Sequence, residues 1–202
     1  MELQAARGGP SLTAFVVAGG RSRRMGRDKA LLAWGERDLL AHALARLVEL
    51  TPDVRILCGA EDRYQERGRP LVRDPEPDGG ALVGIAAGLA ATGVEVALFL
   101  AVDLPLVPVD LLRALVAAVA DADAAVPVTE RGPEPLCAAY RRTCLDPIRR
   151  RLAAGDRKMT AFWPDVRVRT VGTAEVRAFG DPDRLFLNVN DQDDYQRAAS
   201  GA

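Results

Sequence analysis

The sequence predicts an α/β protein in which helices pack against a central sheet. Short apolar, β-prone runs alternate along the chain with stretches whose apolar residues recur at helical spacing, a pattern typical of strand–helix units. Residues 94–102 are almost entirely apolar, as expected for a central strand buried on both faces. The chain has 202 residues, 49% of them hydrophobic, so it can bury one substantial core.

Each strand is expected where an apolar run meets a turn-forming residue, and each helix where one face is apolar. Residues 1–10 fit neither pattern and are expected to form a flexible leader before a single domain at residues 11–202. The first half should contain a strand at 14–17 ending in glycines, a leucine-faced helix at 39–50, strands at 54–58 and 71–72 ending at Gly59 and Asp74, a small-residue helix at 84–91, and the central strand. The second half should contain a helix at 108–119 begun by Pro108 and Asp110, strands at 124–128 and 136–140, a helix at 145–153 ending before Gly155, a strand at 186–191 and a tail helix after Asp191.

The charge balance and the cysteines exclude several classes of partner and site. With 27 basic and 28 acidic residues the formal net charge is −1, so no global positive field attracts nucleic acid or anionic lipid. No apolar run reaches the roughly 18 residues of a membrane span, and the N-terminus lacks the apolar core of a secretory signal. Cys58, Cys137 and Cys144 are odd in number and lack C-x-x-C spacing, which argues against disulfides or zinc and favours the cytoplasm.

A glycine-rich and arginine-rich segment, residues 18–29, directly follows the first predicted strand. Gly19 and Gly20 let the backbone approach a ligand closely, and N–H groups in such a turn can cradle phosphate oxygens. Five cations lie within nine residues, namely Arg21, Arg23, Arg24, Arg27 and Lys29. Because ligands of open α/β sheets bind at the carboxyl ends of strands, this segment is a candidate triphosphate-binding loop. It matches neither the Walker A nor the G-x-G-x-x-G pattern, and the competing interpretation is a flexible basic surface loop.

A lone carboxylate, Asp103, stands at the end of the central strand. If the first and central strands are sheet neighbours, Asp103 faces the phosphate loop, and a cation is then required between the carboxylate and a polyphosphate. Mg²⁺ is the expected cation, because it prefers one or two carboxylates together with phosphate oxygens and water. The alternative is that Asp103 caps the turn before Pro105. Asn190 or Asp191 is either a helix N-cap or a second metal ligand.

Four sequence blocks together resemble the molybdenum cofactor guanylyltransferases, enzymes of the MobA-like NTP transferase family that attach GMP to molybdopterin. The family's strand followed by L-A-G-G-x-S/A-x-R-M-G-x-D-K is matched by residues 17–29, and its G-P-L-A-G is mirrored by residues 80–84. Its C-D-x-P corresponds to residues 102–105, and its F-V-N-V-N-T-P-E-D/E-L to residues 186–194. The blocks occur in the family's order and span nearly all of the chain.

The resemblance implies a three-layer α/β/α, Rossmann-like nucleotidyltransferase fold with a mostly parallel central sheet. Residues of about 11–110 would form the half that binds GTP, and about 111–202 the half that binds molybdopterin. Asn188 and Asn190 would lie near the acceptor and the metal, which Asp103 would hold as Mg²⁺. The nucleotide site would be formed by Val17, Ala18, Gly19, Gly20, Arg24, Lys29, Cys58, Asp74, Gly84 and Asp103.

Departures from the family pattern concern nucleotide selectivity. Cys58 or a neighbour aligns with a family asparagine of the nucleoside site, Ala81 replaces proline, and Asp191-Gln192 replaces Thr-Pro. The double glycine after Ala18 favours the guanylyl branch, because the cytidylyl relatives tend to have L-A-A-G at that place. The alternatives are a cytidylyltransferase, a transferase for a sugar phosphate or other small acceptor, and a non-catalytic nucleotide-binding regulator.

The implied reaction is attack of the acceptor's terminal phosphate oxygen on the α-phosphorus of GTP, with release of pyrophosphate. An ionised phosphate needs no general base, which fits a chain whose only histidine, His42, lies in an ordinary predicted helix. Lys29 and Mg²⁺ on Asp103 would stabilise the transferred group, and Arg24 would hold pyrophosphate. The expected catalytic residues are therefore Arg24, Lys29 and Asp103. Other molybdenum cofactor biosynthesis proteins or molybdoenzyme chaperones would be its protein partners.

Overall fold

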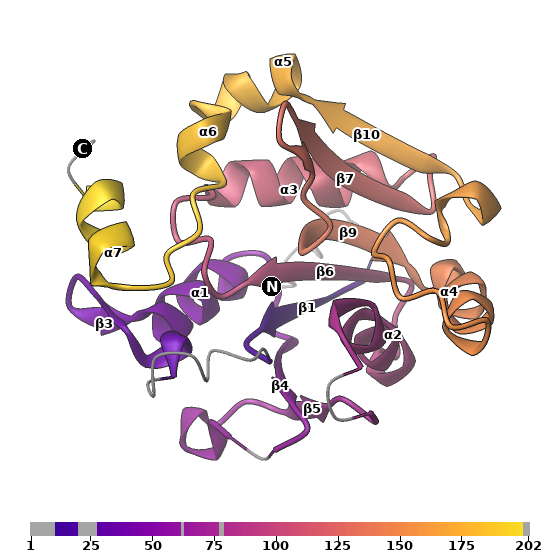
Figure 1. The fold of residues 1–202 in the computed structure, drawn as a ribbon, viewed down its shortest axis with the longest axis horizontal. Coiled ribbons are helices and arrows are strands. Elements are labelled where there is room, and N and C mark those ends of the chain that lie inside the picture. The colour runs from indigo at the N-terminus through magenta and orange to yellow at the C-terminus, as the bar shows by residue number, and fades with distance from the viewer. Residues whose placement is uncertain (1–10, 20–27, 62, 77–78, 200–202) are drawn as a thin grey trace, which may run out of the picture.

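The computed structural model describes residues 11–19, 28–61, 63–76 and 79–199. The expected leader at residues 1–10 and the loop residues Gly20 and Arg24 lie outside the described residues. An eight-stranded sheet forms the centre, in the order β10-β7-β9-β6-β1-β4-β5, with β8 paired to β7 (Figure 1). Its strands are β1 (Leu12–Val17), β4 (Val54–Gly59), β5 (Leu71–Arg73), β6 (Val96–Ala101), β7 (Ala124–Thr129), β8 (Gly132–Pro133), β9 (Cys137–Arg141) and β10 (Val168–Gly172).

Most neighbouring strands of this sheet run parallel. β1 pairs in parallel with β4 and β6, β4 with β5, and β7 with β10. Only β8 and β9 run antiparallel to their described neighbours, β9 to both β6 and β7. The predicted α/β class with a mostly parallel sheet is therefore confirmed.

Helices cover both faces of the sheet and form the outer layers (Figure 1). The larger ones are α1 (Leu39–Val48), α2 (Ala81–Ala91), α3 (Val109–Ala118), α4 (Leu145–Ala153) and α7 (Gln192–Ala199), and the short α5 (Thr173–Val176) and α6 (Pro182–Leu185) precede α7. Single 3₁₀ turns complete the described elements: η2 (Lys29–Leu31), η3 (Gln65–Arg67), η4 (Arg142–Cys144), η5 (Trp163–Asp165) and η6 (Arg177–Phe179).

Side chains of the sheet alternate between two buried cores, one on each face. In β1, Ala14 and Val16 join the core that α1 and α3 cover, whereas Phe15 joins the core beneath α2 and α4. Phe15 stacks on Phe99 of β6 with ring centroids 4.9 Å apart. Every residue of β6 is buried, as its unbroken apolar sequence predicts for a central strand. The two packed faces fix β1 and β6 side by side, and with them the loops at their carboxyl ends.

A predicted strand at residues 186–191 is wrong. The segment forms no strand in the structure and crosses the carboxyl end of β6 as an extended loop between α6 and α7. Its buried residues, Phe186 and Val189, are three positions apart, which does not match the two-residue period of a strand. A two-stranded hairpin, β2 (Ala33–Trp34) with β3 (Arg37–Asp38), was not predicted from the sequence.

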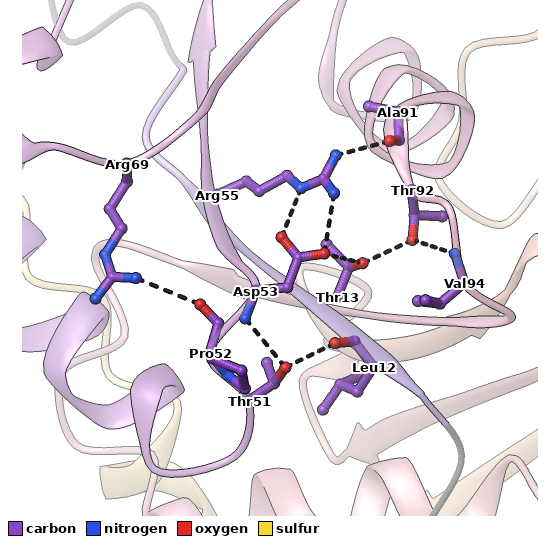
Figure 2. Close-up of polar contacts among 10 residues, drawn as sticks. All are labelled: Leu12, Thr13, Thr51, Pro52, Asp53, Arg55, Arg69, Ala91, Thr92 and Val94. Carbon is purple, nitrogen blue, oxygen red and sulfur yellow. Dashed lines mark hydrogen bonds and ion pairs between the residues drawn. The ribbon is translucent and has the colours of Figure 1, made fainter.

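A polar network ties the amino end of the sheet together (Figure 2). The Thr13 hydroxyl, at the start of β1, donates to Asp53 Oδ2 at 2.8 Å and shares a 2.8 Å hydrogen bond with the hydroxyl of Thr92. Arg55 binds both Asp53 oxygens, at 2.8 and 2.9 Å, and donates to the carbonyl of Ala91 at 2.7 Å. These bonds join β1 and β4 to the end of α2, at the edge opposite the carboxyl ends of β1 and β6.

Within the described part of the chain, no helix has the length and apolar character needed to cross a membrane.

Candidate functional site

Two loops meet where β1 and β6 end. The strands are direct neighbours, with Val17 in register with Ala101, so Gly19 and Asp103 follow at the same edge of the sheet. The N–H of Val102 donates to the Val17 carbonyl at 3.1 Å, which extends the pairing beyond the last residues of both strands. This is the edge at which open α/β sheets bind ligands.

A lysine, a carboxylate and an amide converge at this edge. Lys29 Nζ donates to Asp103 Oδ2 at 2.5 Å and to Asn190 Oδ1 at 3.4 Å. The Lys29 and Asp103 side chains are 24% and 13% exposed, so the pair is partly shielded yet open to a ligand. The structure thus brings together three predicted site residues from three distant parts of the sequence.

The turn that carries Asp103 is held from two sides. The Asp103 carbonyl accepts a hydrogen bond from the N–H of Val189 at 2.9 Å. On the other side, the buried Arg46 of α1 donates to the carbonyls of Leu104 and Pro105 at 3.2 and 3.0 Å. Burial lowers the pKa of Arg46 to about 10, which still leaves the guanidinium charged at neutral pH. The turn that carries Asp103 is therefore fixed by hydrogen bonds to its backbone carbonyls.

Two positioning residues on α1 were missed from the sequence. Arg46 adjoins the buried Leu47 in an amphipathic pattern, and nothing in that pattern distinguishes it from an exposed arginine. His42 contacts the Pro105 carbonyl through Nε2 at 3.0 Å, and because a carbonyl only accepts, the ring nitrogen is the donor. Burial lowers the pKa of His42, which favours the neutral ring and suits a structural rather than a charged role.

The loop after β1 lies against the end of β4. A Cβ added at Gly19 would be 2.7 Å from the backbone nitrogen of Gly59 and 2.9 Å from its Cα, so only glycine fits there. Nearby main-chain groups take part in the sheet, because the N–H of Ala18 donates to the carbonyl of Leu57 at 2.9 Å. Ala18 and Gly19, which are predicted to belong to the nucleotide site, therefore lie against the end of β4.

Asp74 directly follows β5, at the edge of the sheet where the neighbouring strand β4 also ends. Its N–H donates to the Gly59 carbonyl at 2.9 Å, and its Oδ1 would lie 3.2 Å from a Cβ added at Gly84 of α2. Within the described residues its carboxylate has no hydrogen-bond or ion-pair partner, and burial raises its pKa. A desolvated carboxylate at the carboxyl edge of the sheet is a candidate for contact with a ligand hydroxyl or amino group.

Cys58 and Asn188 differ in which of their atoms a ligand could reach in this structure. The Cys58 side chain is fully buried in the core beneath α1, and its Sγ lies 3.5 Å from the carbonyl of Val72. Because the thiol is fully buried, Cys58 could contact a ligand in this structure only through its main chain. Asn188 is exposed, and no hydrogen bond connects its side chain to another described residue.

Glu134 is a further carboxylate near the site that was missed from the sequence. It lies in the turn before β9, where its N–H donates to the Pro127 carbonyl at 2.9 Å. Burial raises the pKa of Glu134, Arg131 opposes this rise, and the negative charge of Asp103 adds to it. The turn-rich sequence around it carries no signal that this residue approaches Asp103.

The residues at this edge suit a cation that also binds phosphate. Asp103 and Asn190 present carboxylate and amide oxygens, the ligand types that Mg²⁺ accepts. Among the described residues no group of three or more histidine, cysteine, aspartate or glutamate side chains could hold a metal ion by itself. A metal at Asp103 would therefore share its coordination with ligand oxygens and water, as Mg²⁺ does in nucleotide sites.

Comparisons with known proteins agree with this geometry. The MobA-like NTP transferase domain family matches residues 14–169. A molybdenum cofactor guanylyltransferase of Burkholderia lata is 37% identical, over 90% of this chain and 92% of its own. A crystal structure of molybdopterin-guanine dinucleotide biosynthesis protein A from Archaeoglobus fulgidus superposes with a TM-score of 0.78 at 24% identity, covering 94% of this chain and 100% of the other. A Mycobacterium tuberculosis protein solved in complex with manganese has the same fold, with a TM-score of 0.66 at 18% identity over 95% and 99% of the two chains.

Proposed function

The chain belongs to the MobA-like NTP transferase family, and from this premise we propose that it transfers GMP from GTP to molybdopterin, forming molybdopterin guanine dinucleotide and pyrophosphate. The observation that carries the proposal is the approach of Lys29 to Asp103 at 2.5 Å, at the shared carboxyl end of β1 and β6. A cation and a carboxylate at this place suit a metal-bound triphosphate. The relatives that match most of the chain are named for the same reaction.

In the proposed reaction, a phosphate oxygen of molybdopterin attacks the α-phosphorus of GTP. The bond between the α-phosphorus and its bridging oxygen to the β-phosphate breaks, and pyrophosphate leaves with that electron pair. Because the attacking phosphate is already ionised at neutral pH, the chain needs no general base. Catalysis then depends on alignment and on neutralising the charge of the transferred group.

Each described site residue has a proposed part in this alignment. Lys29 would neutralise charge on the phosphates, and Asp103 with Asn190 would hold Mg²⁺, which supplies further neutralisation of the phosphate oxygens when bound. The main chain at Gly19 would contact the nucleoside, and Asp74 would accept a hydrogen bond from the nucleoside. Arg24, outside the described residues, is proposed to hold the leaving pyrophosphate.

The two halves of the chain are proposed to divide the substrates. Residues of about 11–110 contribute Lys29, Asp103 and the wall beside β4, and would bind GTP. Residues of about 111–202 contribute Glu134 and Asn190 at the same edge of the sheet, and would bind the acceptor. Asn188 is exposed two residues before Asn190 and remains a proposed acceptor contact. We place the reaction in the cytoplasm, where the three free cysteines would stay reduced.

The test is nucleotide-dependent release of pyrophosphate. The purified protein is incubated with molybdopterin, Mg²⁺ and one of GTP, CTP or UTP, and pyrophosphate is measured together with binding of each nucleotide by calorimetry. We expect release and tight binding with GTP only. Release with CTP in place of GTP would assign the chain to cytidylyl transfer, and binding without release under every combination would refute catalysis.

A further inference from the structure

Tyr64, just after β4, has an unusual backbone for a buried aromatic residue. It is the single non-glycine residue with a positive φ, 71°, within the part of the chain that the structure describes. Its side chain is only 4% exposed. A bulky residue in the left-handed region is strained and persists where its surroundings hold it, most often near functional sites.

The strained backbone directs the phenol of Tyr64 toward Asp28. The Tyr64 hydroxyl donates to Asp28 Oδ2 at 2.7 Å, and Arg63 Nη1 donates to the same oxygen at 3.1 Å. Arg63 is itself held, because its Nη2 donates to the Cys58 carbonyl at 3.3 Å and its guanidinium lies 5.3 Å from the centre of the Tyr64 ring. Burial raises the pKa of Tyr64, so its hydroxyl stays protonated and able to donate.

Asp28 in turn sets the position of the next residue, Lys29. Its second oxygen, Oδ1, accepts the N–H of Ala30 at 3.1 Å and so caps the single turn η2. Its carbonyl accepts the N–H of Leu31 at 3.0 Å. One aspartate therefore links the loop after β4 to the turn that starts with Lys29, whose ammonium reaches Asp103.

The charges of this chain of contacts favour a role in phosphate binding. An isolated Asp28 carboxylate beside the phosphate loop would repel a triphosphate and attract the neighbouring Lys29 ammonium. The Arg63 guanidinium compensates the carboxylate at 3.1 Å, with side chains only 33% and 22% exposed. Lys29 is thereby left to Asp103 and the ligand, since opposite charges in contact largely cancel each other's field.

We propose that Tyr64 and Arg63 are positioning residues for nucleotidyl transfer, which hold Lys29 in place through Asp28. The inference rests on the proposed function for its catalytic consequence. The mechanical part, anchoring of the Lys29 turn from the loop after β4, can be measured in the free protein without any substrate.

The experiment compares Tyr64→Phe with a matched control, Thr13→Val. Each substitution removes one buried hydroxyl that donates to a carboxylate, at 2.7 Å to Asp28 and at 2.8 Å to Asp53, and the control lies at the opposite end of the sheet. Phenylalanine keeps the ring and the same backbone preference as tyrosine. Pyrophosphate release, GTP affinity and amide hydrogen exchange at residues 28–32 are measured for both variants, and for Tyr64→Phe in a Lys29→Ala background.

We expect Tyr64→Phe to lower kcat by roughly ten- to a hundredfold, with a smaller change in KM for GTP, because misplacing a reacting group by about 1 Å costs about that much. Exchange at residues 28–32 should accelerate in this variant and not in Thr13→Val, which should keep wild-type kcat. In the Lys29→Ala background Tyr64→Phe should cost nothing more, because its effect passes through Lys29.

Unchanged amide exchange at residues 28–32 in Tyr64→Phe would overturn the anchoring. If Tyr64→Phe lowered kcat in the Lys29→Ala background by the same factor as in the wild type, its action through Lys29 would be overturned. Where Tyr64→Phe proves too unstable to purify, Arg63→Lys supplies the same comparison, because lysine keeps the charge but cannot bind Asp28 and the Cys58 carbonyl together. If wild-type protein releases no pyrophosphate while exchange responds as expected, the proposed function fails and the anchoring stands.

Discussion

The close approach of the loop after β1 to the end of β4 allows a sharp test with Gly19→Ala. The added Cβ would lie 2.7 Å from the Gly59 nitrogen, about 0.7 Å short of ordinary van der Waals contact. Both neighbours are backbone atoms, and the hydrogen bond from Ala18 to Leu57 at 2.9 Å opposes their separation. Relief therefore requires the two loops to move apart at the mouth of the proposed nucleotide site.

We expect two measurable effects of Gly19→Ala. Overpacking typically costs about 1–3 kcal/mol, which for a chain of this size lowers Tm by roughly 2–12 °C. A displacement approaching 1 Å at the site should reduce kcat/KM for GTP by about ten- to a hundredfold. Thermal unfolding and pyrophosphate release measure the two effects, and calorimetry with GTP shows how much of the second arises in binding.

The matched control is Gly93→Ala, where an added Cβ would meet no atom within 4 Å and where φ is not positive. This variant should keep the Tm and kcat/KM of the wild type. Wild-type GTP affinity and Tm in Gly19→Ala would refute the inference that the contact with Gly59 fixes the site.

Three further outcomes follow from the charges and burial described above. Lys29→Ala and Asp103→Asn should each lower turnover by about 10²–10³, as loss of a charge-stabilising contact typically does. Tm should change little, because a partly exposed ion pair contributes roughly 1 kcal/mol or less to stability. Full pyrophosphate release in either variant would contradict the assignment. Asp74→Asn should weaken GTP binding yet raise Tm at neutral pH. Because burial raises the folded-state pKa of Asp74, its carboxylate destabilises the fold once pH rises through the unfolded pKa, so the gain should vanish in unfolding scans at pH values below that pKa. Burial raises the pKa of Cys137 and of Cys144 to about 12, so a thiol reagent at pH 8 should modify them only after denaturation, and rapid modification of native protein would show that this core opens.

Features that depend on neighbouring residues could be predicted from the sequence. The unbroken apolar run before Asp103 predicted the central strand, and the general rule for carboxyl ends predicted that Asp103 and the first loop would meet if the strands were neighbours. The pairing of Val17 with Ala101 satisfies that condition. The predicted N-cap also holds, because Asp191 Oδ1 accepts the N–H of Asp194 at 2.9 Å at the start of α7.

Features set by distant contacts could not be predicted in this way. The buried Arg46 side chain donates to carbonyls 58 and 59 positions further along the chain, and the hydrogen bond from Tyr64 to Asp28 spans 36 positions. The strand predicted at residues 186–191 failed for the same reason. Phe186 and Val189 are apolar because they cover the end of β6, and a loop can do this without a strand partner.

The bond from Lys29 to Asn190 joins residues 161 positions apart, which affects the order in which the protein can become active. During synthesis, β1, β4 and β6 can pair long before Asn190 leaves the ribosome, and the loop from Phe186 to Asp191 must then fold back across a preformed sheet edge. A nascent chain stalled before this point would contain most of the core residues but would lack Asn190 beside Lys29. Closing so long a loop late costs little extra entropy, because that cost grows only with the logarithm of length. Catalytic competence would thus follow the folding of the sheet as a separate step.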